Sequence, residues 1–158
     1  MEAVKLIPAG KDYLWGGDRL KKEFGKQSEK DRIAETWELS CHPDGPSTIA
    51  QGKDRGKTLA RYIEEQGKGL LGKNCEEFGE FPILIKLIDA KQDLSVQVHP
   101  DNAYAAQAEH QQGKTEMWYV VDCEPGAALY YGLTRELTKQ EFQKHIEDGT
   151  LLQVLNRV

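Results

Sequence analysis

The sequence predicts a mainly β protein with a few peripheral helices, and its 158 residues fit one domain with a core of its own. Three segments support this fold class. Residues 83–88 are rich in isoleucine and leucine, as a buried strand is. Residues 94–99 alternate between apolar and polar side chains, which is typical of a strand with one buried face. Residues 116–121 are expected to form a further strand.

Strand and helix signals also follow one another through the first part of the chain. A short helix is expected over residues 18–24, stopped by Gly25. Residues 33–40 are predicted to form a strand with Trp37 on one face and Glu38 on the other. The carboxylate of Glu38 either holds a lysine or a ligand in place, or is simply solvated, and the solvated interpretation is the default.

Two features of the middle of the chain are informative. Apolar residues spaced i, i+3 and i+4 from Leu59 predict an amphipathic helix that ends near Gly67. The apolar strand at 83–88 is interrupted by Lys86. Because an unpaired buried ammonium is very costly, this lysine must either pair with a carboxylate or reach a cavity.

The last part of the chain is expected to contain two more helices and one more strand. An alanine-rich helix over 101–109 has Asp101 as its N-terminal cap. A strand is expected within 127–133. The sequence at 138–141 is a capping box that starts a helix through Glu147.

Composition narrows the function classes. The net charge of −5 and a pI near 5.4 argue against a nucleic-acid surface, although local lysines could bind an anionic sugar phosphate. No apolar segment approaches the ~20 residues that a membrane-spanning helix needs. The start of the chain lacks the pattern of a secretory signal, so a cytoplasmic location is expected. Three widely spaced cysteines indicate neither a disulfide framework nor a thiolate metal site.

Polar residues on the two predicted strands suggest a metal site. Gln97 and His99 are two positions apart, so they share a strand face with α-carbons roughly 6 to 7 Å apart. Lys114 and Glu116 share a face of the next strand. Pairing the strands would bring an amide oxygen, an imidazole, a carboxylate and an ammonium together, a set that suits zinc or a similar divalent metal. The alternative is an ordinary strand pair whose polar residues face water.

Several motifs carry a resemblance to a known family. They are Leu-Ser-Val-Gln-Val-His-Pro at 94–100, Gly-Lys-Thr-Glu-Met-Trp-Tyr at 113–119, and the segments 13–17, 34–40 and 81–90. In this order and spacing they resemble the type I mannose-6-phosphate isomerases, a zinc-dependent branch of the cupins, in their bacterial short form. The resemblance implies a cupin-type, jelly-roll-like β-barrel, here incomplete at the C-terminus.

The resemblance also implies a function. It is that of an aldose–ketose isomerase that interconverts mannose 6-phosphate and fructose 6-phosphate through an enediol, with one zinc ion bound by Gln97, His99 and Glu116. The family has a further histidine ligand and an arginine beyond the point where residue 158 stands. Residues 1–158 are therefore expected to be the N-terminal part of the metal-binding catalytic domain of a longer isomerase, or an unusually truncated member of the family, with weak activity alone.

Substrate contacts are expected from Lys86, Ser95 and Lys114. Lys86 is interpreted as facing the substrate cavity, rather than as a structural ion-pair partner, largely because the family has a lysine there. Lys114 either carries the proton between the reacting atoms or holds a phosphate or sugar oxygen as a fixed cation, and the sequence does not choose between these roles.

Two other function classes compete with the isomerase. A non-catalytic module that binds a metal or a sugar is the main alternative. A metal-dependent oxygenase is disfavoured, because the Gln97 amide and Lys114 fit poorly with an iron site of two histidines and one carboxylate. Exposed sheet edges in an incomplete barrel could pair with a second copy of the chain, so a homo-oligomer stays open.

Overall fold

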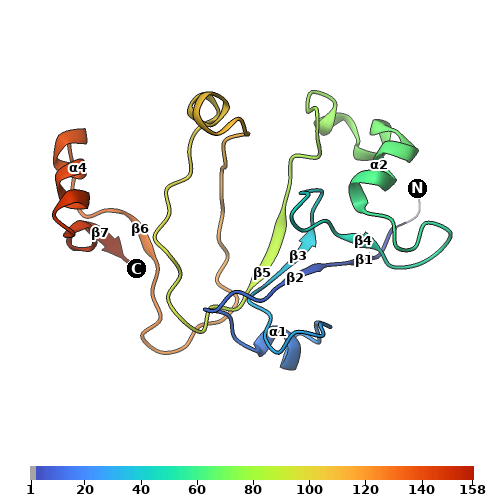
Figure 1. Ribbon diagram of the computed structural model, residues 1–158, viewed down its shortest axis with the longest axis horizontal. Coiled ribbons are helices and arrows are strands. Elements are labelled where there is room, and N and C mark those ends of the chain that lie inside the picture. The colour runs from blue at the N-terminus through green and yellow to red at the C-terminus, as the bar shows by residue number, and fades with distance from the viewer. Residues whose placement is uncertain (1–2) are drawn as a thin grey trace. The chain divides into compact units, whose positions relative to one another are not determined.

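The computed structural model describes residues 3–158, which fall into two compact units, Met1–Leu94 and Ser95–Val158. Figure 1 labels the helices and strands of both units. That both units belong to one domain stays a prediction. No helix among residues 3–158 is long and apolar enough to cross a membrane.

The first unit is built on an antiparallel sheet in the order β2-β3-β5. Its central strand is β3 (Glu35–Leu39), which lies between β2 (Ala9–Lys11) and β5 (Ile85–Ile88). A separate two-stranded sheet joins β1 (Leu6–Ile7) to β4 (Thr48–Ile49). The expected strands at 33–40 and 83–88 are therefore present in shortened form.

Both faces of β3 are covered. Trp37 is 7% exposed, and Thr36, on the other face, is 2% exposed. The flanking Ser40 is fully buried, and its carbonyl accepts a hydrogen bond from the backbone N–H of Ser47 at 2.9 Å. The Ser47 hydroxyl in turn donates to the carbonyl of Trp37 at 3.0 Å. The buried hydroxyls on this face are also paired, since Thr36 donates to Glu38 and Ser40 accepts from the N–H of His42.

The helices of the first unit confirm the sequence signals. Helix α1 (Arg19–Lys22) is followed by Gly25, whose φ of 64° suits a residue without a Cβ. Helix α2 (Leu59–Gln66) starts at Thr58, whose side chain accepts a hydrogen bond from the N–H of Arg61, and ends at Gly67. Two short 3₁₀ helices follow, η1 (Lys68–Leu71) and η2 (Lys73–Cys75).

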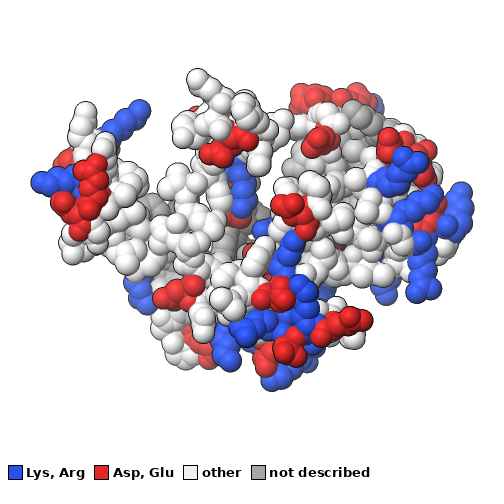
Figure 2. Space-filling view, viewed as in Figure 1, with Lys and Arg blue, Asp and Glu red and all other residues white. Residues whose placement is uncertain are grey.

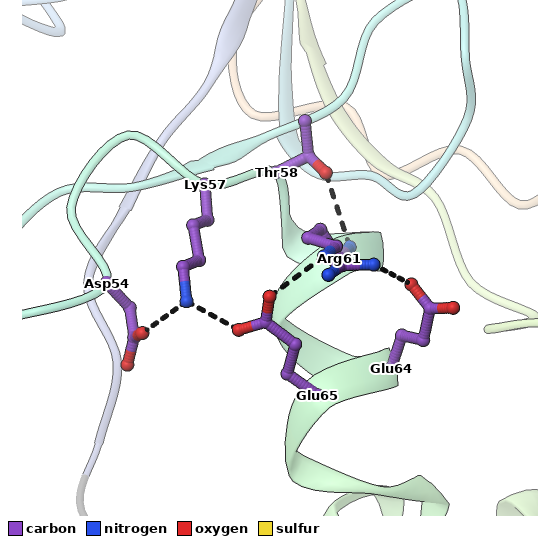
Figure 3. A network of polar contacts seen from close by, with 6 residues as sticks. All are labelled: Asp54, Lys57, Thr58, Arg61, Glu64 and Glu65. Atoms are coloured by element: carbon purple, nitrogen blue, oxygen red, sulfur yellow. Dashed lines mark hydrogen bonds and ion pairs between the residues drawn. The ribbon is translucent and has the colours of Figure 1, made fainter.

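A network of charged side chains ties α2 to the loop before it (Figure 3). Lys57 pairs with Asp54 at 2.8 Å and also with Glu65. Arg61 bridges Glu64 and Glu65 at 2.9 and 2.8 Å. Basic and acidic side chains are intermixed over this region of the face shown in Figure 2. Since exposed ion pairs contribute little individually, the network as a whole, rather than any one pair, is expected to hold this loop against α2.

The second unit contains the remaining helices and strands. They are α3 (Asn102–Tyr104), the π-helix η3 (Ala105–Glu109), β6 (Tyr130–Leu133), α4 (Lys139–Glu147), η4 (Leu151–Gln153) and β7 (Leu155–Arg157). β6 and β7 pair antiparallel. The Asp101 cap and the capping box of Thr138 and Glu141 are both present, as the sequence predicts.

The structure corrects two expectations about the strands. Segments 94–99 and 116–121 are not strands, and no strand lies between residues 91 and 129. Alternation predicts an extended backbone, but a strand also needs a neighbouring backbone with which to form a ladder, and within residues 3–158 these segments do not form one. The described strands form three small sheets with few helices and no closed barrel.

A close backbone approach at Gly16 gives a first prediction. A Cβ at this position would lie 2.4 Å from the Cβ of Ala34 and 2.5 Å from its Cα, so the chains would have to separate. We expect Gly16→Ala to lower the free energy of unfolding by about 1 to 3 kcal/mol in chemical denaturation. Gly69→Ala is the control, because a Cβ at residue 69 would meet nothing within 4 Å. Equal stability of the two variants would contradict this interpretation.

Candidate functional site

Three of the expected site residues come together in the second unit. The Nε2 atom of His99 lies 2.9 Å from Oε2 of Glu116, and the Nζ atom of Lys114 lies 3.0 Å from Oε1. Each carboxylate oxygen therefore has at least one nitrogen partner. The three side chains are 24%, 30% and 43% exposed for His99, Glu116 and Lys114, so a solute can reach them.

Two hydrogen bonds donated by backbone N–H groups explain how residues far apart in sequence meet. The N–H of Lys114 donates to the carbonyl of Pro100 at 3.1 Å, and the N–H of Gly113 donates to Oδ1 of Asn102 at 3.0 Å. These bonds close the base of a helical insert spanning residues 101–112. A Cβ on Gly113 would lie 2.5 Å from backbone atoms of Asp101 and Asn102, so glycine allows this closure.

The carboxyl group of Glu116 is held in its charged form. Burial alone would raise its pKa, but hydrogen bonds from Lys114, Trp118 and His99 outweigh burial and lower the pKa to about 2. Near neutral pH the group is thus an anion that accepts from several donors. A pre-ionised carboxylate beside an imidazole is a suitable pair of ligands for a divalent metal.

The other two expected residues of this unit contact each other instead. Nε2 of Gln97 donates to Oγ of Ser95 at 2.9 Å, and both side chains are exposed. This bond uses the amide nitrogen and leaves the amide oxygen, which is the metal-binding atom, outside it. The structure therefore brings His99, Glu116 and Lys114 together but does not join Gln97 or Ser95 to them by a hydrogen bond.

The types of ligand atom that His99, Glu116 and Gln97 offer are suitable for zinc. Among residues 3–158, no three His, Cys, Asp or Glu side chains gather closely enough to hold a metal ion. A third protein ligand to accompany His99 and Glu116 would have to be of another type, and the Gln97 amide oxygen is such a group. Mixed nitrogen and oxygen ligands of this kind are compatible with zinc.

Lys86 lies in the first unit and has a carboxylate partner. Its Nζ is 3.1 Å from Oε2 of Glu35 and 4.6 Å from the ring centroid of Trp37. The structure thus shows the ion pair that the sequence offered as the alternative role, and substrate binding by Lys86 stays a prediction. Sequence reasoning missed Glu35, although an acidic residue in a buried strand was the available signal.

Glu38, whose role the sequence left open, also holds a lysine. Its Oε1 lies 2.7 Å from Nζ of Lys26 and accepts a hydrogen bond from the hydroxyl of Thr36 at 2.5 Å. The solvated interpretation is therefore wrong, because the carboxylate is half-buried and paired. Glu38 belongs to a structural contact with Lys26 rather than to the cluster around Lys86.

Comparison with known proteins identifies the family. The model of the family described as phosphomannose isomerase type I, catalytic domain, matches residues 3–141. The chain belongs to this family, as its motifs predict. It is 40% identical over 156 residues to a putative mannose-6-phosphate isomerase of Bacillus subtilis (strain 168), covering 98% of this chain and 48% of that protein. It is 39% identical over 145 residues to the mannose-6-phosphate isomerase of Streptococcus mutans, covering 92% and 45%.

Solved structures of mannose 6-phosphate isomerases are also similar to this chain. The crystal structure of the mannose 6-phosphate isomerase from Bacillus subtilis matches with a TM-score of 0.88 at 39% identity, over 98% of this chain and 48% of that one. A zinc-bound mannose 6-phosphate isomerase matches with a TM-score of 0.56 at 31% identity, over 68% and 28%. The chain spans about half the length of the curated relatives it matches.

The hydrogen bonds at Glu116 give a second prediction. Lys114→Met removes a donor that lowers the pKa of Glu116, so the pKa should rise from about 2 toward the ordinary value of 4.5. Side-chain carboxyl carbon NMR of the metal-free chain, titrated with acid, measures this midpoint. Lys139→Met, which changes a lysine on α4, should leave the midpoint unchanged. A midpoint that does not move in Lys114→Met would show that the ammonium has no influence on the carboxylate.

Proposed function

We propose that this chain is the N-terminal part of the catalytic domain of a zinc-dependent aldose–ketose isomerase that interconverts mannose 6-phosphate and fructose 6-phosphate. The observation that carries the proposal is the cluster of His99, Glu116 and Lys114. The names of the relatives, and the zinc bound in one of the solved structures, support it. A cytoplasmic location and a sugar phosphate as the binding partner belong to the same proposal.

His99, Glu116 and Gln97 would hold one zinc ion. Of these, Glu116 is already ionised and His99 already faces it, so little rearrangement of these two is needed. Gln97 would contribute its amide oxygen, which the hydrogen bond to Ser95 leaves available. When bound, zinc supplies Lewis-acid stabilisation for charge that develops on the sugar oxygens.

The isomerisation moves one proton between adjacent carbons and another between their oxygens, through an enediol. His99 is a poor proton carrier, because its ring nitrogen would be committed as a ligand. Lys114 is better placed, since its ammonium lies against Glu116 at 3.0 Å and is partly exposed. It either transfers the proton or fixes a phosphate or sugar oxygen. Ser95 and Lys86 would add substrate contacts through a hydroxyl and an ammonium group.

A non-catalytic module that binds a metal or a sugar is the second candidate. The observation favouring it is that the structure joins His99, Glu116 and Lys114 through their side chains, whereas Gln97, the expected third metal ligand, is hydrogen-bonded to Ser95 instead. In that case the same polar cluster would bind without turnover. A chain with weak isomerase activity would be intermediate between a full isomerase and a non-catalytic binding module.

The zinc site can be tested by calorimetry. The chain should bind zinc, and the double variant Gln97→Ala plus His99→Ala should bind about tenfold more weakly or worse, because it loses two of three ligands. Helix α4 offers a matched control, since Gln143 and His145 have the same residue types and spacing. Changing that pair to alanine should leave zinc affinity unchanged. Equal zinc affinity of the wild type and the Gln97, His99 variant would reject the site.

An assay of mannose 6-phosphate conversion tests the reaction. The zinc-loaded chain and a full-length version should form fructose 6-phosphate, the chain more slowly. If Lys114 transfers the proton, Lys114→Met should lower kcat with little change in KM, whereas loss of an oxygen contact should raise KM. Lys139→Met is the control. A full-length protein that binds the sugar phosphate without converting it would establish the binding module instead.

A further inference from the structure

A buried charged cluster in the first unit lies outside the proposed metal site. Glu35 is only 7% exposed, which is unusual for a carboxylate, and its Oε2 has two partners. The indole Nε1 of Trp37 donates to it at 2.6 Å, and Nζ of Lys86 lies 3.1 Å away. The single oxygen therefore links a tryptophan and a lysine.

The strand register explains this arrangement. In the antiparallel pair β3 and β5, Trp37 lies directly opposite Lys86. Glu35 and Trp37 are two residues apart on β3, so their side chains share the face on which Lys86 approaches. The cluster follows from the hydrogen-bonded backbone of the sheet rather than from a mobile loop.

Trp37 is itself held firmly. The amino groups of Lys11 and Lys86 lie 4.5 and 4.6 Å from its ring centroid, and His42 contacts it edge-on at 5.6 Å. A Cβ on Gly45 would come within 2.6 Å of the ring, so the backbone presses against the indole. The ring and the carboxylate together leave the Lys86 ammonium little freedom.

Stability alone is a poor explanation for this cluster. Replacing a buried ion pair with apolar residues is often neutral or stabilising, because both charges lose hydration. The lysine ammonium has three N–H donors and lies 3.1 Å from the Glu35 carboxylate. The Lys86 side chain remains 20% exposed. The arrangement thus presents a fixed donor at the edge of the buried region.

We propose that Glu35, assisted by Trp37, is a positioning residue that fixes the Lys86 ammonium to donate to a sugar oxygen of the substrate. This inference rests on the proposed function, in which Lys86 contacts the sugar phosphate. The carboxylate partly neutralises the ammonium, so the pair suits a hydroxyl or carbonyl oxygen better than a phosphate dianion. Because Lys86 is already held in place, its side chain loses less conformational entropy when substrate binds.

Glu35→Gln tests the proposal, with Glu38→Gln as the matched control. Both carboxylates are on β3 and both pair with a lysine, but Glu38 pairs with Lys26. In the zinc-loaded protein, Glu35→Gln should weaken fructose 6-phosphate binding about tenfold, whereas Glu38→Gln should not. The affinity for inorganic phosphate should not fall in either variant. Equal fructose 6-phosphate affinities of the two variants would overturn the proposal, and so would parallel losses for both ligands in Glu35→Gln.

A double-mutant cycle separates positioning from a general structural role. If Glu35 acts through Lys86, Glu35→Gln should cost no further affinity in a Lys86→Met background. An additional loss there would mean that the effect does not pass through Lys86. If Glu35→Gln does not fold, Trp37→Phe removes only the indole donor to Glu35 and should weaken binding in the same direction. Unchanged affinity in Trp37→Phe would then remove Trp37 from the proposal.

A measurement without substrate distinguishes failure of this inference from failure of the proposed function. Carbon–proton NMR of the lysine side chains should give Lys86 a shifted signal in the wild type, because it lies over the Trp37 ring. In Glu35→Gln this signal should move toward that of exposed lysines, and in Glu38→Gln it should stay. A shifted signal combined with absent sugar binding would refute the proposed function while confirming the fixed ammonium. A signal that persists in Glu35→Gln would refute positioning by Glu35.

Discussion

The hydrogen bonding of β3 along both of its edges is the constraint on which the first unit depends. Because β2 and β5 pair with it, its backbone groups are satisfied and its side chains can be buried on both faces. This burial determines where charge can be placed. Glu35 is tolerated inside only because an indole N–H and an ammonium reach it from the same face. The stability of the charged cluster therefore depends on the pairing of the sheet.

The second unit also holds charged side chains together, but no sheet supports its cluster of His99, Lys114 and Glu116. His99 and Lys114 contact different oxygens of Glu116, so the carboxylate orders both side chains. Two hydrogen bonds at the base of the insert, one accepted by the Pro100 carbonyl and one by the Asn102 side chain, supply the closure that strand pairing would otherwise provide. Ionisation of Glu116 is favoured by these donors despite its burial, and this balance of hydrogen bonding over desolvation makes the cluster suitable for a cation.

Local signals were sufficient for the helices, since caps such as Thr58 and the box at Thr138 act within one turn. The family motifs placed His99 and Glu116 in one expected site, and the structure brings their side chains to 2.9 Å from each other. The strands expected at 94–99 and 116–121 were wrong because pairing depends on a distant backbone, which no local pattern encodes. The contact between Glu35 and Lys86 was not predicted for the same reason, since it depends on the register between β3 and β5.

The hydrogen bonds beside Gly113 close off the helical insert over residues 101–112. This insert lies in the sequence between His99 and Lys114, two members of the polar cluster. Both hydrogen bonds lie at the junction, between residues 100–102 and 113–114, so the intervening turns are anchored at their root. Segments tethered in this way can be lengthened, shortened or exchanged at modest entropic cost, because loop closure depends only weakly on length. The insert is accordingly the place where natural variation or engineering could alter what approaches the cluster while its geometry is kept.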